Sequence, residues 1–310
     1  MNVLFMGTPD FACFSLASLL ASRHRVTAVI TQPDKPRGRG YTLTPPPVKV
    51  KALEAGLPVY QPTTLRDEEF AALLSEIDPD VIVVVAYGKI LPQNVLDYPK
   101  YGCINVHGSL LPAYRGAAPM QRAIIDGCAT TGITTMYMAA GLDTGDMLLR
   151  EECPILDEDN FETIHDKLGA LGADMIVCTL DALELGEVTR VPQNEAEATY
   201  AAKILKEDCA LSFDRDARAV HNLIRGLSPI PLAFTHTPDG KLLKLVATKI
   251  ADETTEHTTP GKVLSLDNGI TIACRRGAIT VLSVLPEGKG RMSAADFIRG
   301  RKIALGDILS

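Results

Sequence analysis

Residues 81–85 read Val-Ile-Val-Val-Val, a short run of β-branched side chains without a polar position. Such side chains favour strands, and a strand that is apolar on both faces has to be covered on both sides. Similar strand-like runs occur at residues 2–6, 26–31 and 132–138. Helical patterns alternate with them along this part of the chain, at residues 11–20, 48–55, 67–77, 119–126 and 160–185. This alternation predicts an α/β fold with a Rossmann-like, doubly wound parallel sheet, which we place in residues 1–187.

The rest of the chain has a different pattern. Residues 188–207 are polar and have no strong periodicity, so we expect a linker there. One helical pattern follows at residues 217–225, and a second, short one is entered through Ser293. Between them lie strand-like runs at residues 242–247, 261–266, 270–273 and 279–285. Short strands separated by Gly and Asp-Asn turns predict a small β-barrel of the OB-like type in residues 208–310.

Composition limits the class of protein. A length of 310 residues suggests two domains, and 46% hydrophobic with 22% charged residues is ordinary for a soluble protein with a core. The seven cysteines are scattered and form no C-x-x-C pair, which favours reduced thiols over disulfide bonds or a zinc site. The apolar runs are too short to span a bilayer. We therefore expect a cytoplasmic protein that binds neither a membrane nor a metal.

The net charge of −7 is distributed unevenly along the chain. Residues 206–310 contain 15 Lys and Arg against 12 Asp and Glu, whereas the acidic excess lies in residues 1–205. A mildly basic C-terminal part is a weak indication of an anionic partner. Residues 32–49 contain five prolines and a basic centre around Arg39, and their lack of periodicity predicts a long loop. That loop is either solvated surface or a clamp for an anionic partner.

The first predicted strand ends at Gly7, where dinucleotide-binding folds carry a glycine-rich loop. The loop here reads Gly-Thr-Pro-Asp-Phe-Ala and not G-x-G-x-x-G. Pro9 lacks a backbone N–H that a pyrophosphate could use, and Phe11 crowds the approach. The sequence therefore predicts a Rossmann-like sheet without an NAD site.

A strand predicted at residues 103–106 carries Asn105 and is followed by His107 in a loop rich in Gly and Pro. Because strand side chains alternate, Asn105 and His107 project to the same side. An amide that donates to an oxyanion and an imidazole that moves a proton suit a reaction through a tetrahedral intermediate. A lone N-x-H pair is nevertheless more often a turn cap beside a core histidine.

Two further loops follow predicted strands. Asp143 lies in a Gly-flanked turn after the strand at residues 132–138, where it is either a turn former or a carboxylate that orients an imidazole. Residues 86–92 follow the strand at residues 81–85. Doubly wound sheets bind ligands beyond the carboxyl ends of their strands, so we expect these loops and His107 to share one crevice.

Several longer motifs occur in order along nearly the whole chain: GTPDFA, QPDKPRGRG, AYGKILP, NVHGSLLPAYRGAAP, GLDTGDM, TYAAKI and GKGRMSAADFIRG. Together they resemble the folate-dependent formyltransferases, in which N-x-H is followed by S-L-L-P and by a distant D-T-G. The likeness is stronger to the members that act on methionyl-tRNA, because it continues through the C-terminal part. One departure is the LSPIP sequence at residues 227–231, where the family leads us to expect a tryptophan.

The resemblance implies a reaction and its residues. The formyl group of 10-formyltetrahydrofolate would pass to the α-amino group of methionyl-initiator-tRNA, giving N-formylmethionyl-tRNA for translation initiation. Asn105 would donate to the oxyanion, His107 would move the proton, and Asp143 would pair with His107. No metal and no covalent intermediate are needed. The folate-binding residues implied are Ser109, Leu110, Leu111, Pro112, Tyr87, Gly88 and Ile90.

The resemblance also implies contacts with RNA. It assigns Arg39 to the acceptor end of the tRNA and the C-terminal barrel to the tRNA body, with Lys206 as a candidate contact. Further basic candidates are Arg275, Arg276, Lys289, Arg291, Arg299 and Arg301. We expect a monomer that binds tRNA and folate but not DNA. Two rivals are a folate- or nucleotide-binding module without catalysis and a formyltransferase that acts on a small-molecule amine.

Overall fold

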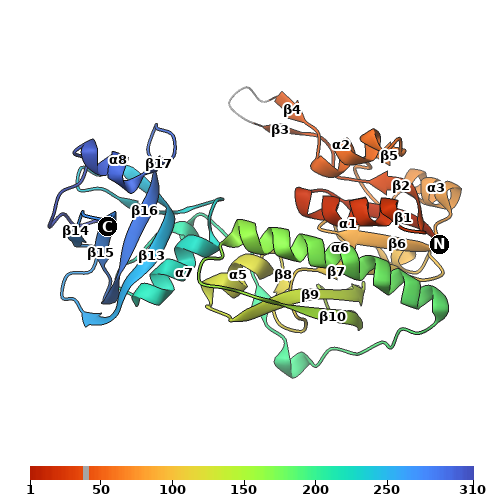
Figure 1. Ribbon diagram of the computed structural model, residues 1–310. Coiled ribbons are helices and arrows are strands. Elements are labelled where there is room, and N and C mark those ends of the chain that lie inside the picture. Colours follow the sequence, from red (N-terminus) through yellow and green to blue (C-terminus); the bar gives the residue numbers. More distant parts are fainter. Residues whose placement is uncertain (38–41) are drawn as a thin grey trace. The chain divides into compact units, whose positions relative to one another are not determined.

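The structure is a computed structural model that describes residues 1–37 and 42–310. The chain folds into two compact units (Figure 1). The first unit contains residues 1–116, 131–154 and 165–200, and the second contains residues 117–130, 155–164 and 201–310. None of the helices in the described part of the chain is long and apolar enough to cross a membrane.

A seven-stranded sheet forms the centre of the first unit, with the strand order β10-β9-β7-β6-β1-β2-β5 (Figure 1). Its strands are β1 (Asn2–Gly7), β2 (Arg25–Ile30), β5 (Val59–Tyr60), β6 (Val81–Val85), β7 (Cys103–His107), β9 (Thr130–Tyr137) and β10 (Met147–Pro154). The five strands from β5 to β7 run parallel to their neighbours. This arrangement confirms the predicted Rossmann-like α/β fold.

One edge of the sheet differs from the prediction, which was a sheet of parallel strands only. β9 pairs antiparallel with β7, and His107 lies opposite Thr134. The sequence predicts no strand at β10, because exposed Glu151 and Glu152 interrupt the apolar pattern there. The sheet is therefore mixed, with an antiparallel edge next to β7.

Helices cover both faces of the sheet, which explains why every residue of β6 is buried. The helices around the sheet are α1 (Asp10–Ala21), α2 (Pro47–Glu54), α3 (Glu68–Ile77), α4 (Gln93–Leu96) and α6 (Phe161–Leu185). Leu4 of β1 packs with Phe70 and Leu74 of α3 in one core cluster. On β7, Val106 contacts α6 so closely that a Cβ atom at Gly172 would lie 2.9 Å from Val106 Cγ1. A larger residue at Gly172 would therefore push α6 off the sheet.

Residues 32–49, predicted to be a loop, contain regular structure at both described ends. β3 (Lys35–Arg37) pairs antiparallel with β4 (Thr42–Thr44), and α2 begins at Pro47. Strands of three residues are too short to give a periodic pattern, so the sequence does not reveal them. Arg39 lies outside the described residues.

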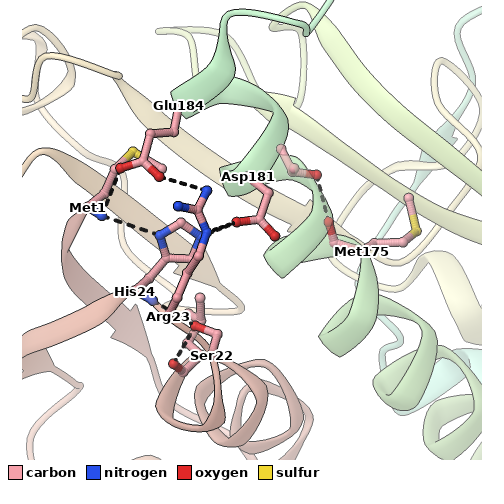
Figure 2. A network of polar contacts seen from close by, with 9 residues as sticks. Met1, Ser22, Arg23, His24, Met175, Asp181 and Glu184 are labelled. Carbon is pink, nitrogen blue, oxygen red and sulfur yellow. Dashed lines mark hydrogen bonds and ion pairs between the residues drawn. The ribbon is translucent and has the colours of Figure 1, made fainter.

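A polar network fastens the last turns of α6 to the start of β2 (Figure 2). Arg23 Nε donates to Asp181 Oδ1 at 2.6 Å, and Arg23 NH2 lies 2.8 Å from Glu184 Oε2. His24 is buried, with Nε2 3.2 Å from Asp181 Oδ1 and Nδ1 3.4 Å from the amino group of Met1. Burial, and then the adjacent amino group, lower the pKa of His24. The hydrogen bond from Arg23 lowers the pKa of Asp181, and the hydrogen bond from the Met1 amino group lowers the pKa of Glu184. Both carboxylates on α6 are therefore anions when they make these contacts.

The second unit is built on an antiparallel sheet with the strand order β12-β13-β16-β15-β14, and β17 pairs with β16. Its strands are β12 (Ala233–His236), β13 (Leu242–Glu256), β14 (Val263–Ser265), β15 (Ile270–Ala273), β16 (Arg276–Pro286) and β17 (Met292–Ser293). Its helices are α5 (Pro119–Ile125), α7 (Ala217–Gly226) and α8 (Ala294–Arg299). Val220 and Ile224 of α7 lie in one core with Leu245 of β13 and Val281 of β16. The unit confirms the predicted strand-rich C-terminal domain.

Strand lengths in this unit depart from the sequence prediction. β13 has 15 residues, although the apolar run at its start has six. Its second half is mostly exposed but still pairs with β16, for example Asp252 with Ala278. β12 and β17, with four and two residues, are not among the predicted strands. The predicted cap at Ser293 is confirmed, since its Oγ accepts from Asp296 N at 3.1 Å.

A buried histidine of α7 predicts a pH-dependent stability. His221 is 6% exposed, and its Nδ1 lies 2.8 Å from Thr248 Oγ1. Burial, and then the nearby Arg225 guanidinium, lower the pKa of His221. Below about pH 6.5 the unfolded chain therefore binds a proton that the native state does not. The free energy of unfolding consequently decreases as the pH is lowered.

We expect the His221→Asn variant to lose part of this decline. Urea unfolding at about pH 7.5 and about pH 5.5 measures the difference for wild type and variant. His24, whose pKa is also lowered, still contributes in the variant. The same decline in both proteins would contradict the assignment of this pH dependence to His221.

Candidate active site

Asn105 and His107 lie on β7 two residues apart, so their side chains point to the same side of the strand. His107 is 6% exposed, and Asn105 is partly exposed. β7 pairs in parallel with β6, and Val84 of β6 lies opposite Asn105. Both residues therefore stand at the carboxyl end of the parallel strands, where doubly wound sheets bind their ligands.

The two ring nitrogens of His107 have different partners. Nε2 lies 3.0 Å from the backbone oxygen of Tyr114, and a carbonyl oxygen can only accept, so Nε2 donates its hydrogen there. Nδ1 lies 3.7 Å from Asp143 Oδ2. This distance is too long for a direct hydrogen bond, but it places the carboxylate beside the ring. Nδ1 is thus the ring nitrogen that is free to exchange a proton.

Asp143 lies in the turn that follows β9, and its φ of +52° falls in the left-handed region that non-glycine residues seldom adopt. Its Oδ2 atom accepts a hydrogen bond from the backbone N–H of Gly116 at 2.8 Å. The side chain is 15% exposed. The structure therefore places the predicted carboxylate beside His107, and the roles of both remain predictions.

The predicted folate-binding segment, residues 109–112, forms a tightly bonded turn after β7. Ser109 Oγ donates to the backbone oxygen of Ala113 at 2.7 Å. Thr134 Oγ1 donates to the backbone oxygen of Ser109 and accepts from Leu111 N, at 2.7 and 3.0 Å. Leu111 and Pro112 are buried, whereas Leu110 is partly exposed. Of these four residues, only Leu110 has a side chain with more than a small exposed area, so the others shape the turn.

The loop after β6 contains the other predicted folate-binding residues. The Tyr87 side chain is 1% exposed and belongs to the core, and burial raises its pKa to about 12. Its backbone oxygen accepts hydrogen bonds from Thr8 Oγ1 at 2.9 Å and Gln32 Nε2 at 3.2 Å. Gly88 has a φ of +84°, and Ile90 is exposed. The Tyr87 ring is therefore a core group, whereas Gly88 and Ile90 are exposed and can contact a ligand.

The chemistry available at the end of β7 is that of an amide donor, an imidazole and a carboxylate. Cys103 lies on the same strand, but burial raises its pKa to about 12, so its thiol is not a ready nucleophile. Within residues 1–37 and 42–310, no three His, Cys, Asp or Glu side chains cluster in a way that could hold a metal ion. The arrangement is suited to proton transfer beside a developing oxyanion.

Sequence reasoning missed a polar cluster next to Asp143. Arg115 is fully buried, and its guanidinium donates to both carboxylate oxygens of Glu195 at 2.9 and 2.7 Å. Arg115 Nε donates to Gln193 Oε1 at 3.0 Å. Gln193 Nε2 in turn donates to the backbone oxygens of Asp143 and Gly145, each at 2.8 Å. The only signal in the sequence was a basic residue within a Gly- and Pro-rich motif, and its partners lie 78 and 80 positions further on.

The basic residues proposed for RNA contact differ in their surroundings. Lys206 is exposed and precedes the short 3₁₀ helix Glu207–Cys209. Arg276 NH2 lies 2.8 Å from Asp216 Oδ2, and Arg275 NH2 lies 3.8 Å from the same carboxylate. Arginines that are paired in this way are weaker candidates than Lys206.

Two family models match the chain, one after the other. The model of formyl transferase matches residues 1–180, and the model of the formyl transferase C-terminal domain matches residues 203–302. The chain belongs to the formyl transferase family. The resemblance read from the sequence motifs is thereby confirmed.

Curated relatives match the enzyme over its full length. It is 48% identical over 307 residues to "Methionyl-tRNA formyltransferase" from Geotalea daltonii, which covers 99% of this chain and 97% of that protein. The protein of the same name from Acetivibrio thermocellus is 46% identical over 310 residues, which covers 100% of this chain and 99% of that protein. The similarity therefore extends through both units.

Solved structures share the fold at low sequence identity. An N-formyltransferase from Helicobacter canadensis, in complex with folinic acid and dTDP-3-aminofucose, has a TM-score of 0.68 and is 17% identical, over 90% of this chain and 98% of that one. HypX from Aquifex aeolicus, in complex with tetrahydrofolic acid, has a TM-score of 0.63 and is 18% identical, over 96% of this chain and 47% of that one. Both likenesses concern the fold.

Proposed function

We propose that this enzyme transfers the formyl group of 10-formyltetrahydrofolate to the α-amino group of methionyl-initiator-tRNA. The observation that carries the proposal is a sequence identity of 46–48%, over 99–100% of the chain, with proteins named methionyl-tRNA formyltransferase. The strand-end grouping of Asn105, His107 and Asp143 supplies chemistry that fits this reaction. The rival that acts on a small amine is disfavoured, because the likeness includes the whole C-terminal unit.

In the proposed reaction the amine nitrogen attacks the formyl carbon. A C–N bond to the amine forms, the bond from carbon to the N10 atom of the folate breaks, and no oxidation or reduction occurs. Negative charge builds on the formyl oxygen between these events. Asn105 is assigned to donate an N–H to that oxygen, and a donor of this kind stabilises the transition state by about 3 kcal/mol.

The amine loses a proton in this reaction and N10 gains one. We assign this transfer to His107 Nδ1, because Nε2 is held by the Tyr114 carbonyl oxygen. The Asp143 carboxylate, 3.7 Å from Nδ1, stabilises the ring while it carries the proton. The Tyr114 contact also prevents the ring from turning, so Nδ1 stays directed toward the carboxylate.

Binding of the two substrates is assigned to separate parts of the chain. The turn at residues 109–112 and the loop with Tyr87, Gly88 and Ile90 follow neighbouring strands, and we assign the folate to them. The tRNA is assigned to Arg39, Lys206 and the C-terminal unit. We retain residues 1–187, 188–207 and 208–310 as the proposed catalytic domain, linker and tRNA-binding domain.

Arg39 carries a prediction about the RNA. In the sequence, Gly38 and Gly40 flank it, within residues 32–49, which contain five prolines. If Arg39 contacts a phosphate at the acceptor end, Arg39→Ala should raise the KM for charged tRNA and make the salt dependence of that KM less steep. Arg39→Lys should recover only part of the loss, because Lys lacks the planar fork that suits phosphate. Rates at several salt concentrations, with folate affinity as the control, test this; weaker folate binding with unchanged tRNA kinetics would contradict it.

The proposed function is tested by initial rates of the purified enzyme with 10-formyltetrahydrofolate and three acceptors. These are methionyl-initiator-tRNA, methionyl-elongator-tRNA and free methionine. We expect formylation of the initiator species at a far higher kcat/KM than of the other two. Equal use of free methionine would favour the small-amine rival, and transfer to none of the acceptors would contradict the proposal.

A further inference from the structure

Three residues that directly precede the last segment of the second unit, residues 201–310, contact the catalytic loops. They are Gln193, Glu195 and Thr199, which we call the strap residues. Each belongs to the same compact unit as β7 and Asp143, and each makes its contacts inside that unit. The sequence predicts a linker for this region.

Gln193 holds the backbone of the turn that carries Asp143. Its Nε2 atom donates to the backbone oxygens of Asp143 and Gly145, each at 2.8 Å, so both N–H groups of the amide are used. Its Oε1 atom accepts from Arg115 Nε at 3.0 Å, which fixes the orientation of the amide. Asp143 has a φ of +52°, in the left-handed region, and the two hydrogen bonds from Gln193 support the backbone in this conformation.

Glu195 fixes the position of Arg115. The guanidinium is fully buried and forms two parallel hydrogen bonds with the carboxylate, a geometry that is specific in direction as well as attractive. The hydrogen bonds with Arg115 lower the pKa of Glu195, so the pair remains charged near neutral pH. Arg115 thereby becomes a rigid support for Gln193.

Thr199 acts on the other catalytic side chain. Its Oγ1 atom accepts from Tyr114 N at 2.9 Å, and its backbone oxygen accepts from Arg115 N at 2.8 Å. Tyr114 has a φ of +60°, and its own backbone oxygen accepts from His107 Nε2. The position of that oxygen sets the orientation of the imidazole. Thr199 therefore influences His107 indirectly, through Tyr114.

We propose that the strap residues are positioning residues of the formyl-transfer site, with Gln193 setting the place of Asp143 and Thr199 setting that of His107. This inference rests on the proposed function for its kinetic test, but the geometry itself does not depend on the substrate. The chain that leads into the C-terminal unit is then part of the catalytic site.

The kinetic test uses Gln193→Glu. This variant keeps the shape of the side chain and an oxygen for Arg115, but it replaces both donors with an oxygen that repels the Asp143 and Gly145 carbonyl groups. We expect kcat to fall by about 10- to 100-fold with the KM of both substrates nearly unchanged, since a small displacement of a catalytic group costs this much. In an Asp143→Ala background the same change should have no further effect.

A matched control is Glu197→Gln, which exchanges carboxylate for amide in the same region. Glu197 is exposed, and its Oε1 atom accepts a hydrogen bond from Asn194 Nδ2 at 2.9 Å. We expect wild-type kcat in this variant. If Gln193→Glu does not fold, as judged by circular dichroism, Gln193→Met keeps the length without the charge and takes its place.

A second readout does not require catalysis. The Gly116 N–H donates to Asp143 Oδ2, so its amide resonance in ¹⁵N-glycine-labelled enzyme reports the position of the carboxylate. We expect this resonance to move in Gln193→Glu toward its position in Asp143→Ala. An unchanged resonance together with wild-type kcat would overturn the inference. If the wild type does not formylate methionyl-tRNA, the proposed function fails, and the Gly116 resonance alone decides on the strap residues.

Discussion

The His107→Ala enzyme is expected to formylate methionyl-tRNA with a kcat about 10²- to 10⁴-fold below that of the wild type. The ring offers Nδ1 for proton exchange, because Nε2 donates to the Tyr114 carbonyl oxygen at 3.0 Å. Without the ring, the proton that leaves the amine has no carrier beside Asp143. The KM for charged tRNA should change little, since the imidazole is buried and offers almost no surface to RNA.

The matched variant is His107→Gln, which retains an N–H donor but cannot take up a proton near neutral pH. We expect it to be nearly as slow as His107→Ala. Initial rates at saturating donor measure the effect, and near-ultraviolet circular dichroism checks that each variant is folded. Wild-type turnover in a folded variant of either kind would remove His107 from the mechanism.

The second large effect is expected at Asn105. Asn105→Ala should lower kcat by about 10²- to 10³-fold, the usual result of removing one oxyanion donor. Asn105→Asp has nearly the same shape, but a carboxylate repels the charge that develops on the formyl oxygen, so it should be at least as slow. Asn105 and His107 point to the same side of β7, and we assign both to one transition state. The double change should therefore cost less than the product of the two single effects.

Single-turnover rates with preformed enzyme–substrate complex separate this effect from binding. The dissociation constants for the folate and for tRNA serve as controls and should stay within a few-fold of wild type. If Asn105→Ala raised the KM of the folate and left the single-turnover rate unchanged, Asn105 would be a binding group and the assignment to the oxyanion would be wrong.

The parts of the fold that could be read from the sequence are those with a strong local pattern. The run at residues 81–85 becomes the fully buried strand β6, and residues 160–185 become α6 with Asn160 as its cap, whose Oδ1 accepts from Thr163 N at 3.0 Å. The antiparallel edge strand β10 could not be read, because three consecutive charged residues face solvent within it. β3 and β4 are too short for any periodicity.

The candidate site likewise has parts that the sequence predicts and parts that it does not. Asn105 and His107 could be placed together because a strand period of two residues relates them. Their meeting with Asp143 does not follow from the predicted parallel sheet, because β9 runs antiparallel to β7 and its last residue, Tyr137, pairs with Ile104 near the start of β7. The support from Gln193 could not be foreseen, because its hydrogen bonds go to backbone atoms 48 and 50 positions away. Likewise, nothing in the local pattern distinguishes Tyr87, a core residue, from a residue that faces a ligand.

The most direct test of the central claim is single-turnover formylation of methionyl-initiator-tRNA by the wild type and by Asn105→Ala/His107→Ala, at saturating 10-formyltetrahydrofolate. Binding of the charged tRNA is measured in parallel for both proteins. We expect the wild type to formylate the bound tRNA fully, and the double variant to bind it equally well but to react more slowly by orders of magnitude. A double variant that reacts at the wild-type rate would contradict the account of this site.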